Sequence, residues 1–433
     1  MNMREILEAR RDGRAHSAEE FSFLARGAAA GSVPDYQLAA WLMAAYLNPL
    51  SPVETADLTV AIADSGARLD LSMLPKPRID KHSTGGVGDK TSLVLLPLLA
   101  ACGATVVKMS GRGLGITGGT VDKLESVPGF RMDLSPEELV AQAQRIGIAI
   151  TGQSPELAPA DKALYALRDV TATVGSIPLI VSSIIGKKLA GGADTIVLDV
   201  KCGSGSFMPE LGRARELAKA LGDTAGRCGL NLRIAITDMD RPLGSAVGNS
   251  LEVAEAARVL RGEAGGRFRD LCVALAGVAL RAGGLAIDEE SGRARAEAAL
   301  RDGSALRKAG VWFQAQGADP AALEGKGMPA ASVVREVRYE GGTRYVSRVD
   351  ARRVGEIVVA LGGGRRQKED RIDPGVGVLL RAEVGSRIEP GQPLASIHAA
   401  TEEAARTAEA ELRLAFSFCD DEPEEAPLIL ECH

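Results

Sequence analysis

Residues 81–89 read Lys-His-Ser-Thr-Gly-Gly-Val-Gly-Asp, and residues 110–120 read Ser-Gly-Arg-Gly-Leu-Gly-Ile-Thr-Gly-Gly-Thr. These glycine-rich stretches, here called loop A and loop B, are separated by a helix-then-strand pattern, so we expect both at one edge of a sheet. Glycine leaves backbone N–H groups free to face an anion, and Lys81 adds positive charge. The loops therefore predict a phosphate cradle. Its expected hydroxyl donors are Ser83, Ser92, Ser110 and Thr120.

Two common nucleotide-binding motifs explain the loops less well. Residues 85–91 imitate a Walker A loop, but Asp89 stands where that motif has glycine before the lysine, and a carboxylate there would repel nucleotide phosphates. Residues 113–118 match the glycine spacing of a dinucleotide-binding unit. However, Pro128-Gly129 ends the next segment before the long helix and acidic residue that a Rossmann unit requires. We therefore expect neither a P-loop NTPase nor a Rossmann dehydrogenase.

The chain has 433 residues, enough for two or three domains. Ser-x-x-Glu capping boxes at residues 17–20 and 51–54 predict helices near the N-terminus, and residues 34–47 predict a helix that is apolar on several faces. From residue 79, β-rich runs alternate with helices, which indicates an α/β sheet with parallel strands. The expected strands are 104–109, 148–151, 195–201 and 232–238, with a helix opened by Ser135.

After about residue 331 the pattern changes to short β-rich runs separated by glycine-rich turns, which predicts a small β-rich module. Residues 385–394 resemble the turn of biotinyl or lipoyl carrier domains, but no lysine stands at the expected hairpin tip, so a structural role is favoured. The expected strands are 333–337, 344–349, 355–361, 376–381 and 393–398.

Composition narrows the expected partners and compartment. The formal net charge is −6 and five acidic residues fall within 420–425, so nucleic acid and anionic membranes are not expected partners. The longest apolar run, 93–107, is too short for a bilayer, and residues 1–14 lack the apolar core of a secretory signal. Six cysteines and four histidines are scattered, which argues against a zinc site or disulfides and favours the cytoplasm.

A second polar constellation lies at residues 165–173 and 182–188. Taken singly, Arg168 is compatible with a salt-bridged helix residue, and Lys187 with a solvated one. Together, their guanidinium and ammonium groups and the nearby hydroxyls suit a ligand that has carbonyls and an N–H, such as a pyrimidine.

A family resemblance is carried by loops A and B, residues 117–125, residues 165–173, Lys187-Lys188-Leu189 and residues 198–201. In this order they resemble the thymidine/pyrimidine-nucleoside phosphorylase family, and the three-part organisation agrees along essentially the whole chain. The resemblance implies reversible phosphorolysis of uridine and thymidine to free base and the sugar 1-phosphate, in nucleotide salvage. It implies inorganic phosphate as co-substrate, no cofactor, and a homodimer formed through a helical lobe.

The expected fold class is α/β (α+β multi-domain). An all-helical lobe is joined to a mixed α/β lobe with a central sheet, and a C-terminal β-rich module follows. The helical lobe is expected to comprise residues 1–70, with a contribution from 160–190. The α/β lobe, which would bind phosphate, is expected to comprise 79–155 and 191–330. The C-terminal module is expected to comprise 331–433. Closure of the two lobes would bring phosphate and base together.

The resemblance also implies roles for individual residues. Phosphate binding falls to Lys81, Ser83, Ser92, Ser110 and Thr120. Pyrimidine recognition falls to Tyr165, Arg168, Ser183 and Lys187, with His82 near the base. Phosphate would attack C1′ with inversion through an oxocarbenium-like state. The expected catalytic residues are His82, Arg168 and Lys187, because the leaving base gathers negative charge that they can stabilise, protonate or hydrogen-bond.

Lys108 bears on the substrate. Family members that accept uridine have lysine at this position, whereas strict thymidine phosphorylases tend to have an apolar residue. The resemblance therefore favours broad specificity for uridine and thymidine. The alternative is a thymidine-specific enzyme in which Lys108 only strengthens the positive field at the phosphate.

Two positions depart from the family pattern, and the first concerns a cation. Some bacterial members bind a monovalent cation through backbone matching Gly88, Leu243 and Ala246, a threonine after the aspartate, and a glutamate matching Glu255. Here Lys90 replaces that threonine. We expect its ammonium to pair with Glu255 where the cation would lie, so no metal is expected.

The second departure is Ile116, where the family has a histidine. That histidine can bridge to a glycine-rich turn, here matching Gly203-Ser-Gly205, when the lobes close. Isoleucine cannot donate this hydrogen bond, whose net contribution is typically about 0.5–1.5 kcal/mol. We expect weakened closure with the chemistry retained; a non-catalytic or altered-ligand homologue is the alternative.

Overall fold

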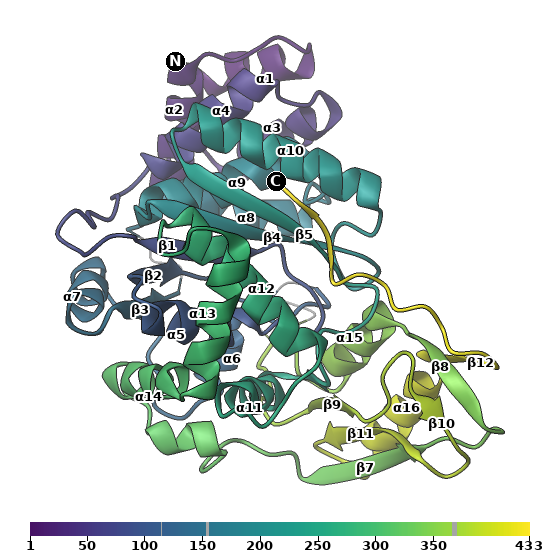
Figure 1. The fold of residues 1–433 in the computed structure, drawn as a ribbon. Coiled ribbons are helices and arrows are strands. Elements are labelled where there is room, and N and C mark those ends of the chain that lie inside the picture. The colour runs from purple at the N-terminus through teal and green to yellow at the C-terminus, as the bar shows by residue number, and fades with distance from the viewer. Residues whose placement is uncertain (114, 153–155, 366–369) are drawn as a thin grey trace.

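The computed structural model describes residues 1–113, 115–152, 156–365 and 370–433. It has three parts: a helical lobe at the top of Figure 1, an α/β lobe in the middle and a small C-terminal module at the lower right. The fold is thus mixed α/β, as the sequence predicts.

Two separate segments build the helical lobe. The first contributes α1 (Met3–Arg11), α2 (Ala18–Ala30), α3 (Asp35–Leu47) and α4 (Pro52–Ala63), and the second contributes α8 (Pro159–Val170) and α9 (Ile177–Gly191). Both predicted capping boxes are present at the starts of α2 and α4. Trp41 and Leu42 are fully buried in the core, which also receives Leu164 of α8 and Leu179 of α9. Residues 160–190 therefore pack with the N-terminal helices.

The central sheet has the strand order β1-β4-β5-β13. Its strands are β1 (Ile79–Ser83), β4 (Thr195–Cys202), β5 (Asn231–Asp238) and β13 (Ile429–Cys432). The first three are parallel, and β13 is antiparallel to β5. A second parallel pair is formed by β2 (Val106–Met109) and β3 (Ile148–Thr151). Loop A follows β1 and loop B follows β2, so the carboxyl ends of neighbouring strands carry both loops.

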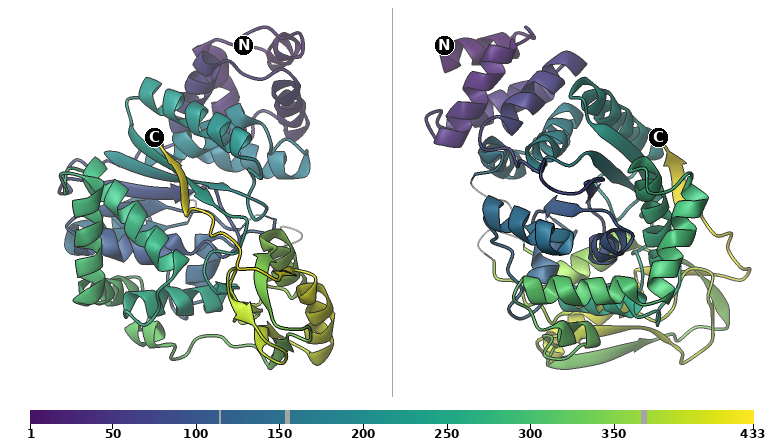
Figure 2. Two further views of the ribbon diagram at one scale, coloured as in Figure 1. Left: turned by 45° about the vertical axis from the view of Figure 1, so that its right-hand side comes forward. Right: turned by 60° about the vertical axis from the view of Figure 1, so that its left-hand side comes forward.

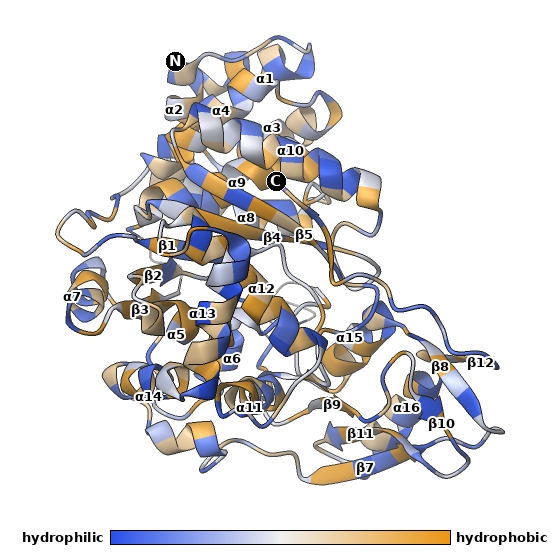
Figure 3. Ribbon diagram, in the orientation of Figure 1, coloured by the Kyte–Doolittle hydropathy of each residue, from blue (hydrophilic) through white to orange (hydrophobic). Residues whose placement is uncertain are grey.

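Helices cover this framework. They are α5 (Thr91–Ala101), α6 (Thr120–Glu125), α7 (Pro136–Ile146), α10 (Leu211–Arg227), α11 (Asn249–Leu260), α12 (Arg267–Ala282), α13 (Glu289–Arg301) and α14 (Ser304–Ala315), followed by a 3₁₀ turn at Pro320–Glu324. In Figure 3, hydrophobic and hydrophilic residues alternate along β4 and β5, and α10 above them carries both kinds as well. Its buried face is apolar, with Leu217 and Leu221 fully buried, so α10 covers one face of the sheet.

In its described residues, the C-terminal module contains two small sheets and two helices. Its elements are β7 (Val333–Arg338), β8 (Arg344–Val349), α15 (Ala351–Ala360), β9 (Gly377–Leu380), β10 (Arg387–Ile388), β11 (Pro393–Ala399), α16 (Glu402–Arg413) and β12 (Phe416–Cys419). One sheet has the order β10-β8-β12, and the other has β9, β11 and β7 together with β6 (Ala246–Val247), which comes from the α/β lobe.

The strand expected at 355–361 is wrong, because these residues belong mainly to α15. The Asp350 side chain accepts a hydrogen bond of 3.0 Å from the Arg353 N–H and caps this helix. Val354 and Ile357 recur at helical spacing and are buried against the module core. The β-branched residues of this run resemble a strand when read alone, but the cap and the spacing select a helix.

The last strand leaves the module. Figure 2 shows the C-terminal segment running from the small module back along the α/β lobe, where β13 pairs with β5. The predicted boundary at 155 lies outside the described residues, and the other boundaries stay predictions. Within the part of the chain that the structure describes, no helix is long and apolar enough to cross a membrane.

Candidate active site

A cavity of about 1960 Å³ lies between the helical lobe and the α/β lobe. Residues of loops A and B line it, as do residues of α8 and α9. Pockets that hold a small molecule usually measure about 300–1,000 Å³. This cavity therefore has room for a nucleoside and an anion side by side, and it is wider than closely bound ligands require.

The residues expected to bind phosphate come together on the α/β side of this cavity. Ser92 lies in the first turn of α5, Ser110 follows β2, and Thr120 begins α6; all three line the cavity. Lys81 is buried in β1, where its ammonium donates to the Thr91 hydroxyl. Lys81 itself is not among the residues that line the cavity; it is a buried positive charge whose ammonium reaches Thr91 instead.

A buried carboxylate holds Lys81 from behind. The Asp199 carboxylate lies 3.7 Å from the Lys81 ammonium and 2.7 Å from that of Lys201. The Thr237 hydroxyl donates to the other Asp199 oxygen at 2.6 Å. Asp199 is thus shared by two lysines, whose ammonium groups also act on the ionised Asp89 of loop A.

Loop A is organised by Asp89. The Ser83 hydroxyl donates to one Asp89 oxygen and accepts a hydrogen bond of 3.1 Å from the Gly85 N–H, while the Thr91 hydroxyl donates to the other Asp89 oxygen at 2.7 Å. Burial opposes ionisation of Asp89, but the surrounding ammonium groups, Lys81 first among them, hold its pKa well below the usual range. Ser83 is therefore committed to an ionised carboxylate in this structure.

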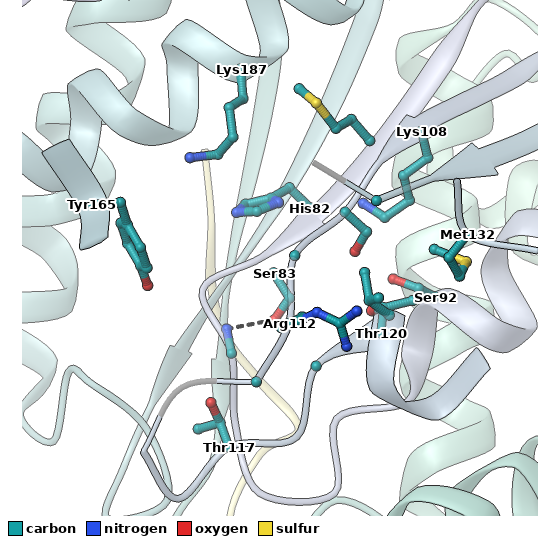
Figure 4. Close-up of a pocket in the computed structure, with 18 of the residues that line it drawn as sticks. His82, Ser83, Ser92, Lys108, Arg112, Thr117, Thr120, Met132, Tyr165 and Lys187 are labelled. Atoms are coloured by element: carbon teal, nitrogen blue, oxygen red, sulfur yellow. Dashed lines mark hydrogen bonds between the residues drawn. The ribbon is translucent and has the colours of Figure 1, made fainter. Parts of the chain in front are cut away.

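His82 occupies the middle of the cavity. Figure 4 shows Tyr165 and Lys187 on one side of its ring and Lys108 and Thr120 on the other. Burial, reinforced by nearby lysines, holds the pKa of His82 well below its usual value, so the imidazole is neutral at neutral pH. A neutral imidazole at this point can donate one hydrogen bond and accept another.

One carboxylate, Asp80, serves two lysines beside His82. Its oxygens lie 2.5 Å from the Lys188 ammonium and 3.4 Å from the Lys108 ammonium. Lys108 also donates to the carbonyl of Lys81. Burial lowers the pKa of Lys108 to about 7, although Asp80 acts in the opposite direction. Lys108 is thus a cavity-lining amine that changes charge near neutral pH.

The helical lobe supplies the side chains expected at the base. The Lys187 ammonium donates to Asp161 and to the Ser183 hydroxyl, both at 2.6 Å, and lies 5.8 Å from the centre of the Tyr165 ring. Burial lowers the pKa of Lys187, and Asp161 partly offsets this effect. Asp161 therefore fixes the direction of Lys187 and helps to keep it charged.

Arg168 is placed differently from the other base-side residues. Its terminal nitrogens donate to the carbonyl oxygens of Leu179 at 3.0 Å and Val174 at 2.8 Å. Its Nε is buried without a hydrogen-bond partner, and the guanidinium lies 5.7 Å from the Tyr165 ring centre. In this structure Arg168 joins α8 to α9 and lines the cavity with a donor still unsatisfied.

Lys90 lies away from the cavity in a closed cage. Its ammonium donates to the carbonyl oxygens of Leu243 at 2.6 Å and Ala246 at 2.8 Å, and lies 2.7 Å from a Glu255 oxygen. Gly88 packs against the same backbone, where an added Cβ would lie 2.9 Å from the Leu243 oxygen. The structure thus brings all five residues together, with the ammonium among the oxygens.

Both residues expected to act in lobe closure touch the C-terminal module. Ile116 is half-buried, and a Cβ added to Gly355 of α15 would lie 2.8 Å from the Ile116 oxygen and 3.1 Å from its Cβ. A Cβ added to Gly205 would lie 2.6 Å from the Cβ of Ala351. Ile116 and Gly205 therefore share α15 as a neighbour.

Sequence reasoning missed the carboxylates of the site. Asp80, Asp161 and Asp199 each hold a lysine that the sequence singled out, and Asp122 holds the backbone of loop B. A signal was available for Asp161, which lies four residues before Tyr165 on the same helix face. Across the described ranges, no group of His, Cys, Asp and Glu side chains is arranged to hold a metal ion.

Family models match three segments of the chain. "Glycosyl transferase family, helical bundle domain" matches residues 4–66, "Glycosyl transferase family, a/b domain" matches residues 75–306, and "Pyrimidine nucleoside phosphorylase C-terminal domain" matches residues 345–418. These segments correspond to the three parts of the structure.

Named relatives match nearly the full length. Pyrimidine-nucleoside phosphorylase of Geobacillus stearothermophilus is 47% identical, with 93% of each chain covered. The protein of the same name from Bacillus subtilis (strain 168) is 44% identical, with 92% of each covered. Thymidine phosphorylase of Rhizobium meliloti (strain 1021) is 43% identical, covering 98% of this chain and 97% of the relative.

A solved structure shares the fold. Anthranilate phosphoribosyltransferase from Thermus thermophilus superposes with a TM-score of 0.60 at 21% sequence identity. The match covers 72% of this chain and 98% of that one. The fold of that chain is thus shared almost entirely, and part of this chain lies outside the shared region.

Proposed function

This chain belongs to the family of pyrimidine-nucleoside and thymidine phosphorylases and phosphorolyses pyrimidine nucleosides with inorganic phosphate as co-substrate; we propose that it accepts both uridine and thymidine. The observation that carries the proposal is the position of Lys108, a buried amine that lines the same cavity as His82. Because Lys108 can donate hydrogen bonds next to that ring, it suits a substrate whose sugar carries a 2′-hydroxyl.

The proposed anion site uses the hydroxyls of Ser92, Ser110 and Thr120 near the buried Lys81, and the Ser83 hydroxyl joins them by leaving Asp89 when phosphate binds. Phosphate held there would face C1′ of the nucleoside and attack it with inversion as the glycosidic bond breaks. The surrounding lysines compensate the charge of the anion, and the sugar passes through an oxocarbenium-like state between phosphate and departing base. Free base and the sugar 1-phosphate are the products.

The proposed base site stabilises the leaving group. Negative charge develops on the pyrimidine as the bond to C1′ breaks. The Lys187 ammonium donates a hydrogen bond of 2.6 Å to Asp161, which orients it. Lys187 and Arg168 together stabilise the negative charge on the base. His82 is neutral in the free protein, so we assign it the role of hydrogen-bond donor to the base. Tyr165 and Ser183 complete the wall of this site.

Lys90 replaces a bound monovalent cation in this proposal. Its ammonium carries one positive charge and faces Glu255 and two carbonyl oxygens at 2.6–2.8 Å. A potassium ion in the same cage would clash with that ammonium, since both need the same oxygens. We therefore assign no step of the reaction to a metal ion.

We also propose a cytoplasmic homodimer formed through the helical lobe. Tyr36 and Leu47 of α3, Val53 of α4 and Val170 of α8 are large apolar side chains that are more than half exposed. Exposed apolar side chains mark interfaces where they form a patch, and these four all belong to helices of the helical lobe. All six cysteines are free, which agrees with a reducing compartment. Light scattering on the purified protein measures the oligomeric state directly.

The substrate range is tested with four nucleosides in which the sugar and the base vary independently. They are uridine, 5-methyluridine, 2′-deoxyuridine and thymidine. Release of free base with phosphate should be seen with all four. Lys108→Met should lower kcat/KM for the two ribonucleosides more than for the two deoxyribonucleosides, whereas Lys162→Met, at an exposed lysine on the same cavity, should not discriminate between them.

Other outcomes of this assay decide the alternatives. Turnover of thymidine and 2′-deoxyuridine alone would mean a deoxyribonucleoside-specific enzyme, and Lys108 would then act only on phosphate. Equal losses for all four nucleosides in Lys108→Met would also reject its role in sugar selection. Absence of phosphorolysis together with absence of base binding would indicate the non-catalytic homologue that Ile116 raises as an alternative.

A further inference from the structure

An ion pair joins the C-terminal module to α6, the helix that follows loop B. Nη1 of Arg365 lies 2.9 Å from Oδ1 of Asp122, although the two residues are 243 positions apart. The Asp122 side chain is 3% exposed, so its charge needs a partner. Arg365 also lines the active-site cavity.

The same carboxylate holds the backbone of loop B. Its Oδ2 accepts a hydrogen bond of 2.6 Å from the Gly113 N–H, and its Oδ1 also accepts from Arg112 at 3.1 Å. The Val121 N–H donates to the Gly111 oxygen at 3.3 Å and closes the loop on itself. Asp122 therefore fixes the segment that follows Ser110 and precedes Thr120, the two hydroxyls that loop B offers to phosphate.

Close packing on α15 supports this connection. A Cβ added to Gly355 would lie 2.8 Å from Cγ2 of Val87 in loop A and 2.8 Å from the Ile116 oxygen in loop B. A side chain at position 355 would push loops A and B away from α15. Because Gly355 has no side chain, α15 can contact both loops. The module thus contacts both phosphate loops at α15, and Arg365 adds a contact to α6 directly after loop B.

We propose that Arg365 is a positioning residue for phosphate, acting through Asp122. Two physical effects lead to this role, and it rests on the phosphate site proposed above. First, Arg365 and Asp122 together fix loop B, so that its hydroxyls and N–H groups are ordered before phosphate arrives. Second, the Arg365 guanidinium adds to that of Arg112 in neutralising a buried carboxylate, which reduces its repulsion of the anion. Neither effect reaches the base, which binds on the helical lobe.

The test separates the two substrates. Arg365→Gln should raise the KM for phosphate by about 10-fold while the KM for the nucleoside changes less than about 2-fold. Arg365→Lys keeps the charge and should recover part of the loss. Arg335→Gln is the matched control, because Arg335 lies in the same module but pairs with Glu409 of α16. Thermal unfolding of each variant shows whether the fold is retained.

A double-mutant cycle identifies the route. In an Asp122→Asn background the carboxylate charge is gone, so Arg365→Gln should add little to the KM for phosphate. An Arg365→Gln enzyme with an unchanged KM for phosphate, or with equal rises for both substrates, would overturn the proposal. If Arg365→Gln does not fold, the KM for phosphate and the KM for the nucleoside are compared in Arg365→Lys instead, and this comparison tests the proposal.

The proposed function fails by a different result. Ser110→Ala and Thr120→Ala should raise the KM for phosphate even if Arg365 proves silent, because these hydroxyls are placed in the anion site itself. If neither raises it, the phosphate site is wrongly assigned and the role of Arg365 fails with it. If both raise it and Arg365 is silent, only the present inference fails.

Discussion

The ammonium nitrogen of Lys90 lies 2.7 Å from a carboxylate oxygen of Glu255 inside the α/β lobe. It also donates to two backbone carbonyl oxygens, so the three donors of the ammonium are matched by three acceptors. Burial alone would raise the pKa of Glu255, but Lys90 and the N–H groups of Ser245 and Ala246 together outweigh this effect and hold that pKa below its usual value. In the proposed function, the Lys90 ammonium therefore supplies the positive charge that a bound monovalent cation would otherwise supply.

Potassium should have little effect on this protein. Replacing choline chloride by potassium chloride at about 0.1 M, a constant ionic strength, is expected to change kcat by less than about 2-fold. Lys90→Thr removes the ammonium from the cage and should acquire a potassium response in both kcat and thermal stability, because the oxygens are left without a positive charge. A wild-type activity that rises several-fold with potassium contradicts this prediction.

The Lys90–Glu255 pair should also matter for stability. Glu255→Gln leaves a buried ammonium without its carboxylate, and breaking such a pair typically costs about 3–5 kcal/mol. Glu263→Gln is the matched control, since Glu263 pairs with Arg261 at a more exposed site and surface pairs contribute about 0–1 kcal/mol. Denaturant unfolding of the two variants gives the comparison, and similar midpoints would show that the cage is not stabilising.

Titration of Lys108 should be visible in the pH dependence of kcat/KM for uridine. Its pKa lies at about 7 because it is buried, so the ammonium is present below this pH and is lost as pH rises through it. If the charged form binds the ribose, kcat/KM for uridine should fall on the alkaline side of pH 7. Asp80→Asn removes the carboxylate that raises this pKa and should move the falling limb to lower pH.

Two comparisons control that experiment. Lys108→Met should lose the limb altogether, because its side chain has no proton to release. If Lys108 selects the sugar, kcat/KM should fall less steeply above pH 7 with thymidine than with uridine. An equal alkaline decrease for both substrates would show that Lys108 acts on phosphate. A limb that stays in place in Asp80→Asn would assign the titration to another group.

Local sequence signals predicted the local structure well. The capping boxes at Ser17 and Ser51 and the strand at 148–151 needed only neighbouring residues to be recognised, and the structure has all of them. α15 was mistaken for a strand because Val358 and Val359 are β-branched, and the apolar face that selects a helix exists only against the module core.

The site could be predicted only in part. Its lysines stand in recognisable motifs, but the carboxylates that hold them come from other strands and helices, as Asp199 does for Lys81. Nothing near loop B in the sequence indicates Arg365, because tertiary packing alone brings it to Asp122. Residue types and spacing thus gave the chemistry, whereas the pairing of charges required the fold.

His82 should act without titrating at neutral pH. Burial and the adjacent lysines hold its pKa well below the usual value, so the working form is a neutral hydrogen-bond donor. His82→Asn keeps a donor and should retain kcat/KM within about 10-fold, whereas general acid catalysis typically contributes about 10²–10⁴-fold. His82→Ala, which has no donor, provides the comparison. A loss in His82→Asn as large as that in His82→Ala would show that proton transfer is required.

Ile116 should control how firmly the phosphate loop rests on the module. Its backbone and Cβ pack on α15 at Gly355, and its side chain joins an apolar core. Ile116→His introduces a donor that can reach toward Gly205 on closure but places a polar ring at this contact. We therefore expect a KM for phosphate lowered by about 2–10-fold, the equivalent of one hydrogen bond, together with a lower melting temperature. Ile116→Val keeps the apolar contact and should change neither. If Ile116→His alters neither catalytic constant, this position has no role in closure.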